Sequence, residues 1–122
     1  MSFQRQTKDL YASASIANGA TATLWSYTIP PRMTGLTQLI ANGCDTAAAV
    51  NGTSFWSLRK NGIGISPYDL IYDILASTYL PRKAETLYLM GGDVISAFAS
   101  NGYSSSAKWS FLLILDIYGE AS

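Results

Sequence analysis

Apolar and polar side chains alternate along several short stretches of this chain, as they do in β-strands that turn one face toward a hydrophobic core. In residues 10–16, for example, Leu10 and Ile16 share a face with alanines, while tyrosine and serine occupy the other face. Turn-forming residues separate these stretches from one another. The pattern predicts about eight strands, at residues 10–16, 21–29, 34–41, 53–60, 63–65, 85–90, 94–99 and 107–118.

The stretch at residues 107–118 has the strongest strand pattern, because apolar residues occupy both of its faces. One face carries Trp109, Phe111, Leu113, Leu115 and Ile117. The other face carries Leu112 and Ile114, where a sheet that met water would carry polar residues. This second apolar face predicts either an interface with another subunit, or cover from a helix or from the N-terminal segment.

Turn signals recur between the predicted strands in the form of Asn-Gly dipeptides. Both residue types tolerate positive φ, which the type I′ hairpin turn requires at its two central positions. The dipeptides are Asn18-Gly19, Asn42-Gly43, Asn51-Gly52, Asn61-Gly62 and Asn101-Gly102. Short strands joined by such turns predict an all-β fold, an antiparallel jelly-roll β-sandwich.

Residues 66–77 depart from the strand pattern, since their apolar positions fall at helical spacing. Ser66 is placed to cap a helix, Pro67 suits the first helical position, and Asp69 occupies the place of a capping-box acid. This segment therefore predicts one short helix or helical turn that crosses the sandwich.

The N-terminal residues 1–9 are polar apart from Phe3, and we interpret them as an arm or a disordered end. Residues 10–122 have the size of a single domain. No signal peptide precedes them, and no apolar run approaches the length that crosses a bilayer. We expect the protein to be made in a cytoplasm, to stay soluble and to have no membrane partner.

Charge is sparse in this chain, at 13% of residues, and the formal net charge is zero. Without a basic cluster there is no electrostatic footprint for a nucleic acid, so we expect no nucleic-acid partner. A neutral surface also removes one barrier to self-association. Cys44 is the single cysteine, which excludes an intrachain disulfide and predicts a buried free thiol.

The sequence contains few side chains of the kinds that catalyse reactions or bind metals. The chain has no histidine, and so it lacks the commonest general base and metal ligand. Asp69 and Asp73 lie four residues apart, but a helix cap plus a solvated acid explains them more simply than a hydrolase dyad or calcium site. Asp45 and Asp93 are interpreted as turn residues. We expect a protein that is not an enzyme, with no catalytic residues, cofactor or metal.

Aromatic residues are the remaining candidates for function. Trp25, Trp56 and Trp109 lie within predicted strands and are most simply core residues, although exposed aromatics could also stack on sugars. Tyrosines in the loop and helical segments are expected at the surface, where tyrosine favours interfaces. Together with the second face of the last strand, they define the candidate interface residues Leu112, Ile114, Tyr68, Tyr72 and Tyr103.

Three stretches together resemble a known family. They read ANGATATLWSYTIPPRMTG, FWSLRKNGIGISPYDLIYDIL and LYLMGGDVISAFASNGYSSSAKWSFLLILDIYG. Their order of turns, prolines, a Gly-Gly-Asp turn and a terminal apolar strand is similar to small jelly-roll virion proteins of tailed bacteriophages, of the capsid decoration or cement type. Similar modules occur in tail and fibre proteins.

The resemblance implies a homo-oligomer, often a trimer, with a dimer as the alternative. It would sit on the major capsid protein or another virion protein and reinforce the shell. We therefore expect a non-enzymatic protein that binds and stabilises a bacteriophage capsid, located in the virion. The alternative is a receptor- or glycan-binding head of a tail or fibre, for which Tyr103 in the loop at residues 101–106 is the candidate contact.

Overall fold

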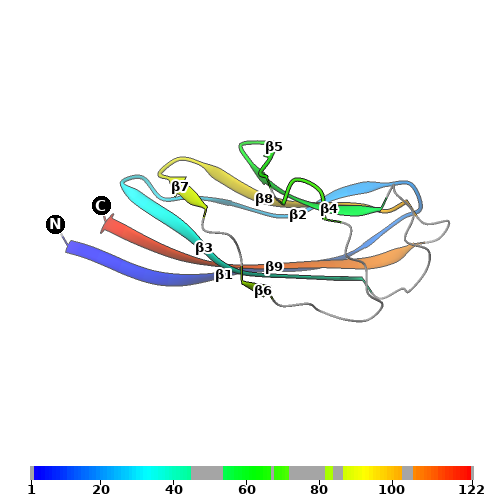
Figure 1. The fold of residues 1–122 in the computed structure, drawn as a ribbon, viewed down its shortest axis with the longest axis horizontal. Helices are drawn as coiled ribbons and strands as arrows, with labels where there is room; N and C mark the ends of the chain where they lie inside the picture. The colour runs from blue at the N-terminus through cyan, green and yellow to red at the C-terminus, as the bar shows by residue number, and fades with distance from the viewer. Residues whose placement is uncertain are drawn as a thin grey trace.

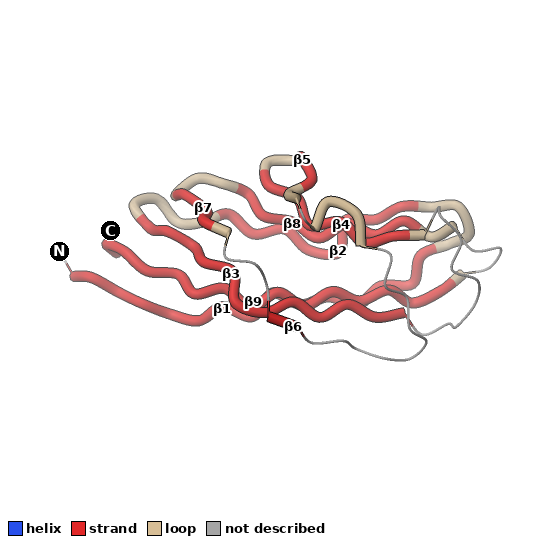
Figure 2. The backbone as a smooth tube through the Cα atoms, viewed as in Figure 1, coloured by secondary structure: helices blue, strands red, loops and turns tan. Residues whose placement is uncertain are grey.

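The computed structural model of this chain describes residues 2–44, 54–66, 68–71, 82–83, 87–102 and 106–121. Within them the chain forms two antiparallel sheets that face each other across a core, as Figures 1 and 2 show. The strands are β1 (Ser2–Ile16), β2 (Thr21–Thr28), β3 (Met33–Cys44), β4 (Phe55–Lys60), β5 (Ile63–Gly64), β6 (Arg82–Lys83), β7 (Tyr88–Met90), β8 (Val94–Ser100) and β9 (Ala107–Ala121).

The larger sheet, which we call the β1 sheet, has the order β1-β9-β3-β6, and β7 also pairs with β3. The smaller one, the β2 sheet, has the order β2-β8-β4-β5. The strands β1 to β4 alternate between the sheets, as do β7 to β9, whereas β4 and β5 form a hairpin within the β2 sheet. At the end that holds the two termini, Figure 1 shows β1, β9, β3 and β7 one above another as the β1 sheet twists.

The core lies between the two sheets and is built from the alternate residues of each strand. On β9, the residues Trp109, Phe111, Leu113, Leu115 and Ile117 are all fully buried. This confirms which face of the last strand turns inward. The rings of Trp56 and Trp109 meet across the core with centroids 4.5 Å apart. The indole nitrogen of Trp56 donates to the Ser110 carbonyl at 3.1 Å, which satisfies the polar atom of a buried ring.

Tryptophans in the core were expected, and the structure confirms this for Trp56 and Trp109, while Trp25 packs against the core half-buried. The Trp25 indole donates to the Phe111 carbonyl at 3.0 Å. Cys44 is a buried free thiol, as predicted.

The first strand is longer than the sequence pattern indicates. Residues 2–9 continue β1 and pair with β9 without interruption, so that Ser2 lies opposite Ala121. The expectation of a disordered end is therefore wrong for these residues, because a partner strand supplies the hydrogen bonds that a polar segment cannot find alone. Whether residues 1–9 also act as an arm toward a neighbouring subunit stays a prediction.

The predicted helix is not present in the described part of its segment. Ser66 and residues 68–70 form turns and bends, and Ile71 makes an isolated antiparallel bridge with Trp56. The Leu58 amide donates to the Tyr68 carbonyl at 2.8 Å, so this segment hydrogen-bonds to β4 instead of to itself. Pro67 and residues 72–77 lie outside the described residues.

The Asn-Gly dipeptides have different roles in the structure. Asn61 and Gly62 have φ values of 53° and 82° and form the tight β4–β5 hairpin, as predicted. Asn18-Gly19 joins strands of different sheets, with positive φ at the glycine. Asn42-Gly43 was expected to end a strand, but it lies inside β3, where Asn42 is buried. Asn51-Gly52 lies outside the described residues.

Candidate interaction surface

Large apolar side chains gather on the outer face of the β1 sheet, the face turned away from the core. The ladder registers set Tyr11 opposite Leu112 and Leu36 opposite Tyr88, and directly opposed residues point to the same side of a sheet. We call this surface the apolar face. It comprises Phe3, Tyr11, Leu36, Leu39, Tyr88, Met90, Leu112, Ile114 and Tyr118.

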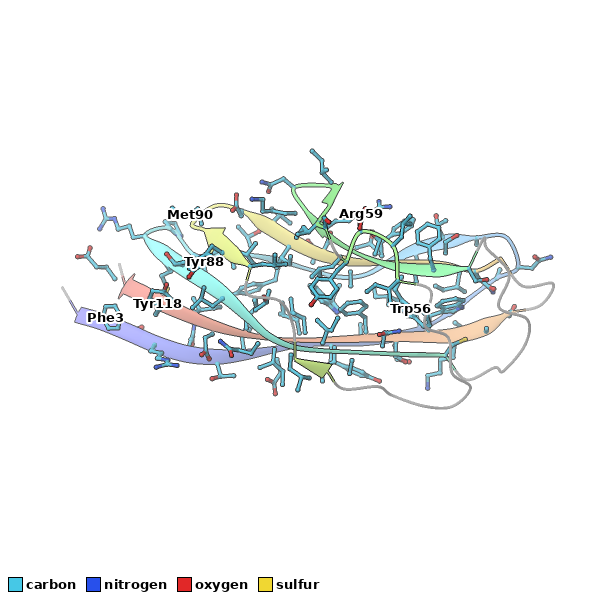
Figure 3. All side chains as sticks on the ribbon, in the orientation of Figure 1. Phe3, Trp56, Arg59, Tyr88, Met90 and Tyr118 are labelled. Carbon is cyan, nitrogen blue, oxygen red and sulfur yellow. The ribbon has the colours of Figure 1, made fainter. Side chains whose placement is uncertain are left out.

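Four members of the apolar face are strongly exposed. Phe3 exposes 71% of its surface, Tyr88 66%, Met90 62% and Tyr11 53%. In Figure 3, the labelled Phe3, Tyr118, Tyr88 and Met90 lie at the end of the molecule that holds the termini, whereas Trp56 lies between the sheets. Scattered single apolar residues are normal on a protein surface, but a contiguous group of this kind marks an interaction site.

The group is contiguous because neighbouring strands bring its members into adjacent rows. The rings of Phe3 and Tyr118 lie with centroids 6.3 Å apart. Tyr118 lies opposite Thr34, which in turn lies opposite Met90. A hollow of about 270 Å³ opens between β1, β9 and β3, lined by Phe3, Arg5, Leu36, Asp116 and Tyr118.

The carboxylate of Asp116 lies among the apolar side chains of this face, which also carries Asp9 opposite Ile114 and Glu120 opposite Phe3. The Asp116 oxygens accept hydrogen bonds from Arg5 at 3.0 Å, Thr7 at 3.1 Å and Gln38 at 3.2 Å. The Arg5 bond, more than any other contact, lowers the pKa of Asp116 below its ordinary value of 3.8. Three donors from two neighbouring strands thus keep this acid charged and fixed among apolar side chains.

A β-bulge makes one of these contacts possible. The register of β3 against β9 shifts between Thr37 and Leu39. Thr37 stays buried and its hydroxyl accepts from the Leu87 amide at 3.0 Å. Gln38 is the extra residue, so its exposed side chain turns outward toward Asp116.

The outer face of the β2 sheet has a different composition. The registers place mostly hydroxyl residues there, namely Thr21, Thr23, Ser26, Thr28, Ser96 and Ser100. Its one large ring in β8, Phe98, is covered by the Arg59 guanidinium, which lies 3.8 Å from the ring centroid. A second hollow lies beside the β4–β5 hairpin, lined by Ser57, Arg59, Gly62, Ile63, Gly64, Asp69 and Leu70.

The structure separates the predicted interface residues into three groups. Leu112 and Ile114 lie half-buried on the apolar face, where the sequence pattern placed them. Tyr68 was expected at the surface but is buried in the core with 9% exposed, because its segment folds back onto β4. Tyr72 and Tyr103 lie outside the described residues, as do Asp45 and Asp73.

Sequence reasoning missed several members of this surface. Tyr88 and Met90 flank the buried Leu89 in strict alternation, which is a signal for two exposed apolar residues on one strand face. Phe3 was assigned to an unstructured end, and so its position on a strand face was not considered. Leu36 carried no distinguishing signal, since its exposure depends on the bulge and on β7.

The described residues offer little chemistry. Among them, no group of three or more histidine, cysteine, aspartate or glutamate side chains could hold a metal ion. Asp93 acts in the turn that joins β7 to β8, as predicted, where it accepts from the Met90 amide at 2.9 Å and from the Asn61 side chain at 3.1 Å. In the described part of the chain, no helix has the length and hydrophobicity to cross a membrane.

Comparisons with known proteins add little to this picture. No protein-family model and no curated protein matches the chain. One solved structure is similar along 98% of this chain and 92% of its own, at 10% sequence identity and a TM-score of 0.39, and it is described as "Bacillus endospore appendages form a novel family of disulfide-linked pili".

Proposed function

We propose that this chain is a non-enzymatic virion structural protein that binds and stabilises a bacteriophage capsid as a decoration or cement protein. The observation that carries the proposal is the apolar face, a contiguous group of exposed apolar side chains on one side of a β-sandwich. Burial of such a group against another protein is favourable in proportion to the apolar area removed from water. The absence of histidine from the chain fits an attachment role better than a catalytic one.

Strand order supports the finer part of the proposal, a jelly-roll topology. The orders β1-β9-β3-β7 and β2-β8-β4-β5, read in the two sheets, describe eight strands. The strands β1 to β4 and β7 to β9 alternate between the sheets along the chain while β4 and β5 form a hairpin, which fits two interlocked Greek keys.

The layout of the apolar face suits attachment to a second protein surface. It extends over four neighbouring strands, and Asp116 with Arg5 gives it a fixed polar group for orientation. Several weak attachments of this kind, made by linked copies, give tight binding without a large contact in each copy.

The proposal is tested on virus particles from the source of the sequence. Particles purified on a density gradient should contain the chain in many copies, as measured by mass spectrometry. Particles from a deletion strain should release their DNA at a lower temperature, and the purified protein, when added back, should restore the original temperature. Particles that lack the chain, or whose heat stability does not change with it, would contradict the proposal.

The alternative, a receptor- or glycan-binding head, rests on Tyr103, which lies outside the described residues. A glycan array distinguishes the two functions. Specific binding that is lost in Tyr103→Ala would favour the head module, whereas no binding together with particle attachment would favour decoration.

A further inference from the structure

The first strand ends the β1 sheet with an unusually open edge. Among the described residues, β9 is the ladder partner of β1, and the other side of β1 faces away from the sheet. Residues 3–9 are all exposed, although they form a regular strand. Their backbone amides and carbonyls on that side are therefore available for pairing with another strand.

Proteins usually protect such an edge, and β1 carries little of this protection. Natural edges are short, bulged, interrupted by proline or lined with charged side chains, and of these devices β1 has only the charges of Arg5, Lys8 and Asp9. The strand is 15 residues long, contains neither proline nor glycine, and pairs with β9 without any register shift. The edge strand of the other sheet, β2, is 8 residues long and has a bulge between Thr23 and Trp25.

We propose that the occupant of this edge is β1 of a second copy, paired antiparallel about a two-fold axis at Thr7. This inference rests on the proposed function in one respect only, which is that copies of this chain are expected to associate with one another. In this register Arg5 of each copy lies opposite Asp9 of the other, so the pairing makes two opposite-charge contacts. Phe3 likewise lies opposite Tyr11, and opposed aromatic residues stabilise antiparallel pairs.

The charged side chains of Arg5 and Asp9 support this register, because both are exposed and lie on the same face of β1. Arg5 exposes 71% of its side chain while it contacts Asp116. A guanidinium has five N–H donors, so it can bond Asp116 and an opposing Asp9 together. Lys8 points to the other face, where its ammonium lies 5.2 Å from the Tyr27 ring centroid and leaves the pairing edge open.

The same register avoids the corner where the chain leaves the sheet. Ser2 of one copy would lie opposite Ala12 of the other, so that residues 13–16 stay outside the pairing. Beyond them, residues 17–20 lead β1 into β2 of the other sheet. The two sheets would join into one continuous sheet, and the two apolar faces into one surface.

A cysteine cross-link tests the register. Thr7→Cys should form a disulfide-linked dimer under mild oxidation, because opposed residues have the separation that a disulfide needs. Asp9→Cys is the matched control on the same strand face. Its two copies would be about 13 Å apart along the strands, so it should stay unlinked. The native Cys44 is buried, and so we expect it not to take part in the oxidation.

Light scattering after size exclusion gives the second measurement. The unmodified protein should be a dimer at micromolar concentration, and Asp9→Arg should weaken it roughly tenfold by placing like charges opposite each other twice. Circular dichroism confirms that each variant is folded. A monomeric wild-type protein, or an oligomer in which Thr7→Cys does not link faster than Asp9→Cys, would overturn the proposal.

These outcomes are independent of the particle experiment. A protein that decorates particles but never links through Thr7 would contradict the edge pairing alone. A linked dimer that is absent from particles would support the edge pairing and contradict the virion function.

Discussion

The two sheets differ on the faces that they turn away from the core. The outer face of the β2 sheet carries threonine and serine, and its Phe98 ring is covered by Arg59. The outer face of the β1 sheet carries exposed Phe3, Tyr88 and Met90 around Asp116, whose carboxylate accepts three side-chain hydrogen bonds. The β2 sheet thus turns mostly polar or covered side chains outward and exposes Ile63 at its β5 edge, whereas the β1 sheet exposes a group of large apolar side chains.

The difference between the two faces shows what can be learned from a strand in which apolar and polar residues do not alternate strictly. A strand with water on one side needs apolar residues on the opposite side alone. β8 buries Ile95, Ala97 and Ala99 and departs from this rule at Val94 and at Phe98, whose ring is covered by Arg59. β9 breaks the rule at Leu112 and Ile114, which stability of the isolated sandwich does not require. Residues of this kind are the ones to examine for attachment.

The largest expected effect is on the free energy of unfolding, and it distinguishes two neighbouring residues of β9. Leu113 is fully buried and Leu112 is on the apolar face. Leu113→Ala should lower the free energy of unfolding by about 2–5 kcal/mol through lost burial and a cavity. Leu112→Ala should cost about 1 kcal/mol or less. Urea denaturation measures both, and equal costs would show that the apolar face is covered in the free protein.

A pair of charge substitutions compares the two outer faces directly. Leu112→Asp places a charge on the apolar face, and Thr23→Asp places one on the hydroxyl-rich face of β2. The first should weaken attachment to particles at least about tenfold, because an interface cannot bury an unpaired carboxylate cheaply. The second should leave attachment unchanged. If the two variants bind equally, the apolar face is not the attachment surface.

A smaller effect is expected at the β4–β5 hairpin, where the Asn61 side chain reaches the turn between β7 and β8. Asn61 has φ 53°, and its side chain donates to Asp93 and accepts from the Val94 amide at 2.8 Å. Asn61→Ala should lower the free energy of unfolding by about 1–2 kcal/mol, through lost hydrogen bonds and a backbone conformation that alanine resists. Thermal denaturation measures this. Lys60→Ala, one residue away and exposed, is the control and should change little.

The smallest effect is a pH dependence. The folded-state pKa of Asp116 lies below 3.8, chiefly through the Arg5 hydrogen bond. Its contribution to stability is therefore present above pH 3.8 and is lost as the pH falls below that value through the lowered pKa. Asp116→Asn should flatten the stability curve in that acidic range and lower the stability slightly at neutral pH, where the wild-type contribution is fully present.

Asp93 provides the comparison for this pH effect. Its pKa is also lowered, but first through the Met90 amide rather than through a charged side chain. Added salt should therefore reduce the acid-linked stability at Asp116 more than at Asp93. Equal salt sensitivity of the two carboxylates, measured with Asp93→Asn and Asp116→Asn, would contradict this assignment of causes.

The sequence predicts the parts of the fold that depend on local periodicity. The inward face of β9, the Asn61-Gly62 hairpin and the turn at Asp93 follow from residue type and spacing alone. Parts that depend on a distant partner were not predictable in this way. β1 is extended by β9, and Asn42-Gly43 is held in β3 by the same strand.

The candidate surface shows the same division. Leu112 and Ile114 could be identified because two-sided apolarity is visible within one strand. Tyr68 was misplaced, since its burial depends on hydrogen bonds to β4 that helical spacing does not reveal. The grouping of Phe3 with Tyr118 and Met90 depends on strand order, which brings residues from three parts of the chain together.

The position of β9 between β1 and β3 also constrains how the protein is made. The strand at residues 107–121 follows every other described strand in the chain, yet it supplies the pairing partner of both neighbours. β9 must therefore be synthesised before the larger sheet can close. Until then β1 has no ladder partner among the described strands, whereas β3 can pair with β6 and β7. Closure of the larger sheet is thus expected to wait for β9 and to be slow, as it is in chains dominated by non-local pairing.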